Sequence, residues 1–314
     1  MAIRKVTFIK EPAYEMESDQ FKAIVVPGLG SNLLSLYDKK HNVELVRTPE
    51  NREEYEQRPM LYGTPVLFPP NRIEDAVFTF KGKTYHLEMN RAKENNHIHG
   101  FVHNKPWHMV SMEDDKNQLI TRLRSEDFPE IIRQFPHSFE LTLSFTLTDK
   151  GLRQSLTVAN RGTETMPVGL GYHTTFNFPI HSSRLQLEVG KQWELNNRML
   201  PTGELLDSAV QNELAAGALL EGRKLDDAFV MTDNKKAVLS MPETGISIVY
   251  SVGDTFKHWV VFNGQGTEDF VAVEPYSWIT NAPNLQLPAE TTGLMGVEPG
   301  KEKNFETEIT VMPL

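Results

Sequence analysis

The sequence predicts an all-β protein, a large β-sandwich with a few short helices. Its strongest local pattern is a period-two alternation of apolar and polar residues, which is the pattern of a half-buried strand. Turn residues follow the alternating segments, and helical stretches are few. Many short strands with few helices favour two large packed sheets, which we expect to form one continuous domain over residues 1–314.

The clearest pair of strands lies between residues 139 and 160. Residues 139–148, FELTLSFTLT, place apolar side chains on one face and polar side chains on the other. Asp149-Lys150-Gly151 then supplies turn residues, with a glycine free to adopt a positive φ. The alternation resumes at Leu152 and ends at Asn160-Arg161-Gly162. This pattern predicts a β-hairpin.

Other segments show the same alternation of apolar and polar residues or have the composition of short helices. We expect strands at residues 23–26, 247–252, 270–273 and 305–311. Short helices are expected within residues 125–134 and 203–220. The 19 prolines and 20 glycines are spread along the chain and do not gather into a linker, which supports a single domain.

Composition excludes several classes of function. A net charge of −10 disfavours nucleic acid and membrane surfaces as partners, because both are anionic, but it leaves a neutral sugar open. The absence of cysteine excludes disulfides, thiolate nucleophiles and cysteine-ligated metal. The first residues have no signal-peptide core, and no stretch approaches the about 20 apolar residues of a membrane helix, so we expect a cytoplasmic protein. Motifs of nucleotide enzymes and serine hydrolases are absent.

Four of the ten histidines fall between residues 97 and 108. His97 and His99 are two residues apart and on a strand would share one face, so either could line a site or be an ordinary core or surface residue. Such a pair can also ligate a divalent metal. However, the glutamate that would complete a cupin-like metal site does not follow them, so we expect no metal.

Two segments carry candidates for acid/base chemistry. His173 lies in GYHTTFNFP, which we expect to be a strand that ends in a loop, although a lone histidine there is often structural. Glu274 follows an apolar strand and precedes Pro275. Burial there would raise the pKa of the carboxyl towards that of a useful general base, whereas a solvated position would leave it an ordinary surface group. Trp278 either offers a flat face to a sugar ring or packs in the core.

Two further segments offer groups for sugar hydroxyls. Asn71-Arg72 follows a double proline, and the arginine presents a planar fork of donors. Asp226 or Asp227, in KLDDAF, could accept hydrogen bonds from neighbouring hydroxyls. Each segment alone is weak evidence, since arginines and aspartates on loops are usually just solvated.

The combination of these segments in chain order resembles the aldose 1-epimerase (galactose mutarotase-like) family. The matching elements are Asn71-Arg72, His99-Gly100, His173 in HxxFN, residues 225–229 and Glu274-Pro275. The resemblance covers nearly the whole chain, from about residue 31 to the C-terminal strand. It implies a large twisted β-supersandwich with an open sugar-binding cleft.

The resemblance also implies roles for individual residues. Glu274 matches the general base of the family, His173 its general acid and His99 its second active-site histidine. The Asn71-Arg72 pair matches the substrate-binding position. Asp226 matches the hydroxyl-binding aspartate, with Asp227 leaving an ambiguity of one residue. The role of His97 stays open.

The implied activity is aldose 1-epimerase, an isomerase that interconverts the α and β anomers of a free aldohexose by acid/base ring opening and reclosure. This chemistry requires no cofactor, and the expected partner is a small-molecule sugar bound by a monomer or homodimer. We expect the pKa of His173 to lie at or above about 6.5, because the Glu274 carboxylate would stabilise the imidazolium. The sequence does not name the sugar.

Three other functions are also compatible with the sequence. A hexose-6-phosphate 1-epimerase is the nearest, although relatives of that type tend to carry arginine where this chain has His103. A non-catalytic carbohydrate-binding module on the same fold is the second, but it would not need both His173 and Glu274. The third is a metal-dependent β-barrel isomerase that uses His97 and His99.

Overall fold

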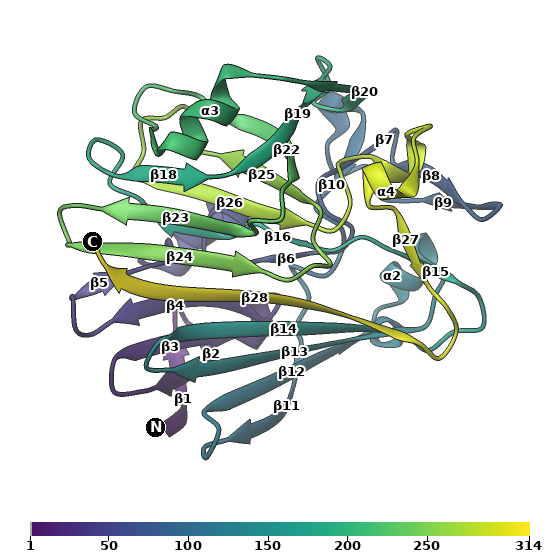
Figure 1. Ribbon diagram of the computed structural model, residues 1–314. Helices are drawn as coiled ribbons and strands as arrows, with labels where there is room; N and C mark the ends of the chain where they lie inside the picture. The colour runs from purple at the N-terminus through teal and green to yellow at the C-terminus, as the bar shows by residue number, and fades with distance from the viewer. Residues whose placement is uncertain (1) are drawn as a thin grey trace.

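The computed structural model describes residues 2–314. Over these residues the strands form a nine-stranded, an eight-stranded and a five-stranded sheet, together with three two-stranded ribbons. The two largest sheets pack on each other as a twisted sandwich, with the nine-stranded sheet in front in Figure 1. The all-β sandwich predicted from the period-two pattern is therefore confirmed.

The two large sheets contain strands from most of the chain. In spatial order, the nine-stranded sheet contains β11 (His108–Glu113), β12 (Gln118–Arg124), β13 (Phe139–Thr148), β14 (Gly151–Asn160), β28 (Glu302–Pro313), β24 (Ile246–Val252), β23 (Lys236–Met241), β18 (Arg184–Leu187) and β21 (Ala218–Leu219). The eight-stranded sheet contains β20 (Pro201–Leu206), β19 (Val189–Leu195), β22 (Asp226–Met231), β25 (His258–Phe262), β26 (Phe270–Tyr276), β16 (Gly171–Tyr172) and β6 (Val66–Leu67), with β17 (Thr175–Asn177) also paired to β26.

Smaller elements surround this sandwich. The five-stranded sheet contains β1 (Ala2–Phe8), β2 (Glu11–Glu17), β3 (Phe21–Val26), β4 (Asn32–Asp38) and β5 (Val43–Glu44). The ribbons pair β7 (Arg72–Glu74) with β10 (Asn96–Ile98), β8 (Val77–Phe80) with β9 (Lys83–His86), and β15 (Met166–Val168) with β27 (Met295–Val297). The helices are α1 (Arg52–Gln57), α2 (Pro129–Gln134), α3 (Ala209–Ala216) and α4 (Ala289–Thr292), with 3-10 turns at Pro27–Leu29, Pro59–Leu61, Ala92–Glu94, Ser125–Asp127 and Ala282–Asn284.

The predicted hairpin forms the middle of the nine-stranded sheet. Strands β13 and β14 pair in an antiparallel register that closes at Thr148 and Gly151. Burial alternates along β13, as the alternating sequence requires. The C-terminal strand β28 then lies between β14 and β24, so the last segment of the chain joins the hairpin to the rest of the sheet (Figure 1).

Aromatic side chains join the two large sheets. The ring of Tyr250, on β24, lies 5.4 Å from that of Phe176 on β17 and 6.1 Å from that of Trp259 on β25. These rings are completely buried. Successive residues of a strand point to opposite faces. Trp259 and Val273 face this shared core. Phe262, three positions after Trp259, and Glu274, next to Val273, therefore point away from it. That outer face of the eight-stranded sheet carries the pocket described below.

Strand β26 is longer than the sequence predicts. We expected the strand to end at Val273, but it continues through Glu274 and Pro275 to Tyr276. Proline lacks an N–H and is normally excluded from the middle of a sheet. Here the ladder on the side of β16 and β17 is interrupted at Pro275, because β17 pairs with residues 270–272 and β16 pairs with Tyr276. His173 lies in the short segment between β16 and β17, beside this interruption.

Two other local predictions need correction. Residues 125–134 form a 3-10 turn and then α2, because Phe128 precedes Pro129 and therefore has an extended backbone at φ −131° and ψ 90°. His97 and His99 do not share a strand face, since β10 ends at Ile98 and His99 has a φ of 63°. In the part of the chain that the structure describes, no helix is long and apolar enough to cross a membrane.

Candidate active site

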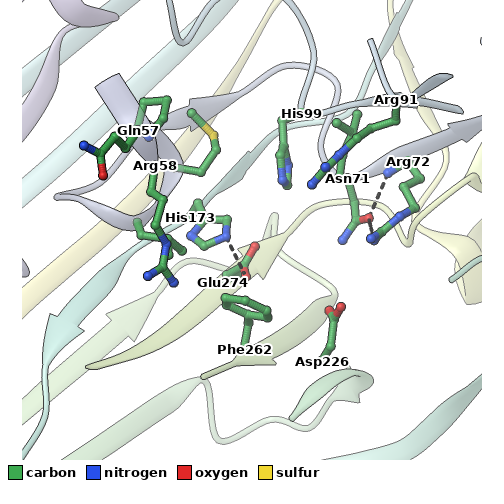
Figure 2. Close-up of a pocket in the computed structure, with 14 residues that line it drawn as sticks. Gln57, Arg58, Asn71, Arg72, Arg91, His99, His173, Asp226, Phe262 and Glu274 are labelled. Carbon is green, nitrogen blue, oxygen red and sulfur yellow. Dashed lines mark hydrogen bonds and ion pairs between the residues drawn. The ribbon is translucent and has the colours of Figure 1, made fainter. Parts of the chain in front are cut away.

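A pocket of about 360 Å³ opens on the outer face of the eight-stranded sheet (Figure 2). All six site residues predicted from the sequence line it, although they come from segments spread over more than 200 positions. Its lining consists of Gln57, Arg58, Pro59, Met60, Leu61, Asn71, Arg72, Arg91, Ile98, His99, His173, Asp226, Phe262 and Glu274.

His173 and Glu274 face each other at the centre of the pocket. His173 occupies the break between β16 and β17, and its backbone N–H donates to the carbonyl of Pro65 at 3.1 Å. Its Nε2 lies 3.3 Å from Oε1 of Glu274 (Figure 2). Only 5% of His173 and 2% of Glu274 is exposed to solvent. The interruption in the sheet therefore brings a buried imidazole into contact with a buried carboxyl.

Burial sets the protonation of this pair. It raises the pKa of Glu274 to about 8, with a hydrogen bond from Tyr276 lowering it, the charge of Asp226 raising it and that of Arg72 lowering it. Burial also lowers the pKa of His173 to about 4. Our expectation that the pKa of His173 lies at or above 6.5 is therefore wrong, because desolvation outweighs the attraction of a carboxyl that is itself protonated. Between these pKa values the pair holds one proton, on Glu274.

A chain of hydrogen bonds fixes the carboxyl of Glu274. The hydroxyl of Tyr276 donates to Oε2 of Glu274 at 2.5 Å, and Nδ2 of Asn71 donates to the Tyr276 oxygen at 3.2 Å. Nη1 of Arg72 in turn donates to Oδ1 of Asn71 at 3.0 Å, and Nε of Arg72 donates to Glu94 at 3.1 Å. One carboxyl oxygen of Glu274 is thus held by Tyr276, while the other faces His173.

Two positive-φ residues bring His99 to the pocket. Asn71 has a φ of 53° and His99 a φ of 63°, and the N–H of His99 donates to the Asn71 carbonyl at 2.9 Å. The next residue, Gly100, must be glycine, since a Cβ there would lie 2.0 Å from the carbonyl oxygen of Phe68. The His99 ring lies edge-on to that of His173 at 5.5 Å, and burial holds the pKa of His99 well below its usual value. This accounts for the histidine-glycine pair seen in the sequence.

The structure distinguishes the two adjacent aspartates. Asp226, the first residue of β22, lines the pocket opposite Phe262 of β25. Asp227 points to the other face of the strand and accepts a hydrogen bond from Gln192 Nε2 at 2.6 Å. Burial raises the pKa of Asp226, with the charge of Arg72 lowering it. Asp226 is therefore the aspartate that a ligand in the pocket can reach.

Other residues considered at the sequence level lie outside the pocket lining. The Nδ1 of His97 contacts the Glu88 carbonyl at 2.6 Å. Trp278 is buried against Gly169, where an added Cβ would lie 2.0 Å from the indole, so it belongs to the core. His103 is not among the lining residues. Among residues 2–314, no group of three or more histidine, aspartate or glutamate side chains is placed to hold a metal ion.

The sequence interpretation missed part of the site. Tyr276 could have been found, because it lies two residues after Glu274 and a strand places such residues on one face. Phe262 lies on another strand, with its ring centre 6.1 Å from that of His173. Arg58 and Arg91 come from connecting segments with no distinctive motif. Only the three-dimensional arrangement brings these last three residues to the pocket.

Comparison with known proteins identifies related chains. The model of the family described as aldose 1-epimerase matches residues 12–310. The Escherichia coli protein YphB, whose function is uncharacterised, is 25% identical over 249 residues, which cover 77% of this chain and 80% of YphB.

Solved structures show the same fold. A galactose mutarotase-like protein from Clostridium acetobutylicum superposes with a TM-score of 0.94 at 29% identity, over 100% of this chain and 99% of the other. A galactose 1-epimerase from Lactobacillus acidophilus superposes with a TM-score of 0.77 at 16% identity, over 99% of both chains. At that identity the second likeness concerns the fold alone.

Proposed function

Because the chain belongs to the aldose 1-epimerase family, we propose that it interconverts the α and β anomers of a free aldohexose by acid/base ring opening and reclosure. The observation that carries this proposal is the contact of 3.3 Å between Nε2 of His173 and Oε1 of Glu274 in the pocket. A buried imidazole and a buried carboxyl that share one proton are the groups that this reaction needs.

The reaction begins when the shared proton moves from Glu274 to His173. The carboxylate then removes the proton of the C1 hydroxyl, and the imidazolium donates a proton to the ring oxygen. The bond from C1 to the ring oxygen breaks, and C1 becomes an aldehyde. Rotation about the bond between C1 and C2 presents the other face of the carbonyl, and reclosure with the two roles reversed gives the other anomer. The pair ends with one proton, so none is consumed.

The remaining pocket residues would orient the sugar. Asp226 accepts hydrogen bonds from hydroxyls. Arg72 and Asn71 bind the sugar, and Asn71 also donates to Tyr276. His99 lies beside His173 at the reacting end. Ring opening by the two central groups needs neither metal nor nucleotide.

Anomer exchange measured by NMR tests the proposal. Purified protein at catalytic concentration is added to equilibrated glucose and galactose, and exchange between the two H1 signals is followed at fixed pH and buffer. We expect exchange far faster than with the same amount of heat-denatured protein. Saturable sugar binding without faster exchange would contradict the proposal and favour a carbohydrate-binding module.

Replacement of Asp226 should weaken substrate recognition. We expect Asp226→Asn to lower kcat/KM by about 10- to 100-fold, the range of one or two hydrogen bonds to a charged group. Asp227→Asn is the matched control, because Asp227 binds Gln192 and faces away from the pocket. Equal effects of the two substitutions would contradict the assignment of Asp226.

Tyr276 should act by positioning and tuning Glu274. Tyr276→Phe removes a hydrogen bond that stabilises the carboxylate, so the pKa of Glu274 should rise above its present value of about 8. We expect the alkaline limb of the pH profile of kcat/KM to move to higher pH. The plateau should fall by about 10-fold, because the form with a carboxylate and an imidazolium becomes rarer.

Tyr85→Phe is the control for this substitution. Tyr85 is also buried, and its hydroxyl contacts Nε2 of His137 at 2.7 Å outside the pocket. The Tyr85→Phe substitution should therefore leave the pH profile of kcat/KM unchanged. A Tyr276→Phe variant with slower exchange but an unmoved alkaline limb would show that Tyr276 contributes only to packing.

A further inference from the structure

Arg91 differs from the other arginines of the pocket in having no partner for its charge. Arg58 donates to Glu268 at 2.7 Å, and Arg72 donates to Glu94 at 3.1 Å. Within residues 2–314 the guanidinium of Arg91 makes no hydrogen bond or ion pair. It is nevertheless part of the pocket lining, beside His99 and Asn71 in Figure 2.

The backbone around Arg91 is firmly held. Its N–H donates to the Asn96 carbonyl at 3.0 Å, and the N–H of Asn96 donates back at 3.2 Å. The side chain of Asn90 makes two hydrogen bonds to the backbone of Ile98, at 2.9 and 2.7 Å. These bonds fix the start of the Arg91 side chain next to the segment that carries His99. The fold therefore holds the backbone of Arg91 at the edge of the pocket, and the exposed side chain extends from there to the lining.

The pocket lining offers little negative charge to balance Arg91. Glu274, whose pKa is raised to about 8, is protonated and uncharged near neutral pH. Asp226 is the other acidic residue of the lining, and it lies well apart from Arg91 in Figure 2. The positive charges of Arg72 and Arg91 also contribute to the low pKa of His99, so the Arg91 charge acts on the interior of the site. With Arg58 and Arg72 paired to carboxylates, the part of the pocket around Arg91 thus carries an unbalanced positive charge, in a chain whose net charge is −10.

We propose that the preferred substrate is an aldose that carries a carboxylate, a hexuronate, and that this carboxylate pairs with Arg91. A guanidinium presents two parallel N–H donors that match the two oxygens of a carboxylate. One unpaired guanidinium balances one carboxylate, whereas a phosphate dianion would leave a charge uncompensated. The inference rests on the proposed anomer exchange, but it replaces a neutral aldohexose by an aldose oxidised at C6 as the preferred substrate. It makes Arg91 a residue that determines specificity.

Rates of anomer exchange on matched sugars test this inference. The probes are glucuronate, its neutral amide glucuronamide, glucose and glucose 6-phosphate, each followed by NMR at low and high salt. For the wild type we expect kcat/KM for glucuronate to exceed that for glucuronamide and glucose by about 10- to 100-fold. The advantage should shrink at high salt, because Arg91 is exposed and its charge is screened.

Variants of Arg91 test whether this residue causes the preference for glucuronate. Arg91→Gln should lower kcat/KM for glucuronate by about 10- to 100-fold and remove its advantage over glucuronamide. Arg91→Lys keeps the charge but not the fork, and it should retain part of the advantage. Arg153→Gln is the control for net charge, because Arg153 is exposed and pairs with Glu308 outside the pocket. It should leave the preference unchanged.

The possible failures are distinguishable. Equal rates on glucuronate, glucuronamide and glucose would overturn the carboxylate preference and leave the proposed function standing. An Arg91→Gln variant that lowers all rates equally would also overturn it. Faster exchange of glucose 6-phosphate than of glucuronate would replace the carboxylate by a phosphate. Folded protein that accelerates none of the four sugars would overturn the proposed function and, with it, the preference.

Discussion

Glu274→Gln is expected to lower kcat/KM for anomer exchange by about 10²- to 10⁴-fold, the range that a general base contributes. Glutamine has nearly the same shape as glutamate but cannot accept the C1 hydroxyl proton. The Tyr276 hydroxyl can still donate to the amide oxygen, so the local packing is preserved. The residual rate should fall as pH rises through about 4, because only the His173 imidazolium remains to act.

The same substitution has a predictable effect on stability. The pKa of Glu274 rises from 4.5 to about 8 on folding, so the folded protein holds a proton that the unfolded chain has released. The contribution of Glu274 to stability is therefore greatest below pH 4.5 and is lost as pH rises through 8. Glutamine does not titrate. Hence the Tm of Glu274→Gln relative to the wild type should increase from pH 5 to pH 9.

Glu44→Gln is the matched control for both measurements. Glu44, on β5, is partly buried outside the pocket, and burial raises its pKa to about 7. Its carboxylate accepts hydrogen bonds from Ser35 and Leu36. We expect Glu44→Gln to alter the pH dependence of Tm without lowering the rate of anomer exchange. A Glu274→Gln variant that is as active as Glu44→Gln would exclude Glu274 as the base.

Local sequence pattern was sufficient to predict much of the fold. The hairpin of β13 and β14 begins and ends where alternation and turn residues place it, because both strands have one buried and one polar face. Strand β26 was harder to predict. It is buried throughout, so it has no alternation, and Pro275 suggested an end. Whether a proline is tolerated depends on which backbone groups lie opposite it, and that is decided by strand pairing over long sequence distances.

In the candidate site, too, some features could be predicted from the sequence and others could not. His173, Glu274 and Arg72 could be proposed because the order of their motifs resembles a known family, and the structure brings them to one pocket. The pKa of His173 could not be predicted, since it depends on how completely neighbouring strands exclude water. Arg91 could not be singled out either. Its significance lies in the absence of an ion-pair partner within residues 2–314, which only side-chain geometry reveals.

The shared proton makes the wild-type pH profile a further test of the mechanism. The pair carries two protons below a pKa of about 4, one proton between about 4 and 8, and none above. The reactive form, with a carboxylate and an imidazolium, has the same number of protons as the resting form. Its fraction is therefore constant across the one-proton range. We expect kcat/KM to be bell-shaped and to decline below about pH 4 and above about pH 8.

His173→Gln should lower kcat/KM by about 10²- to 10⁴-fold and also invert the alkaline limb of this profile. Without an acid, the residual reaction depends on the Glu274 carboxylate alone. That form increases as pH rises through about 8, so the variant should become faster where the wild type becomes slower. The measurement is the rate of anomer exchange from pH 5 to pH 9.5, corrected at each pH for the reaction without protein.

His258→Gln controls for the loss of a buried histidine. His258 lies on β25 outside the active-site pocket, is 1% exposed, and has its pKa lowered by burial to about 3. This variant should keep the bell-shaped profile of the wild type even if its Tm falls. If His173→Gln also kept a profile that declines above pH 8, the proton lost there would not belong to Glu274. Another pair of groups would then have to open the ring.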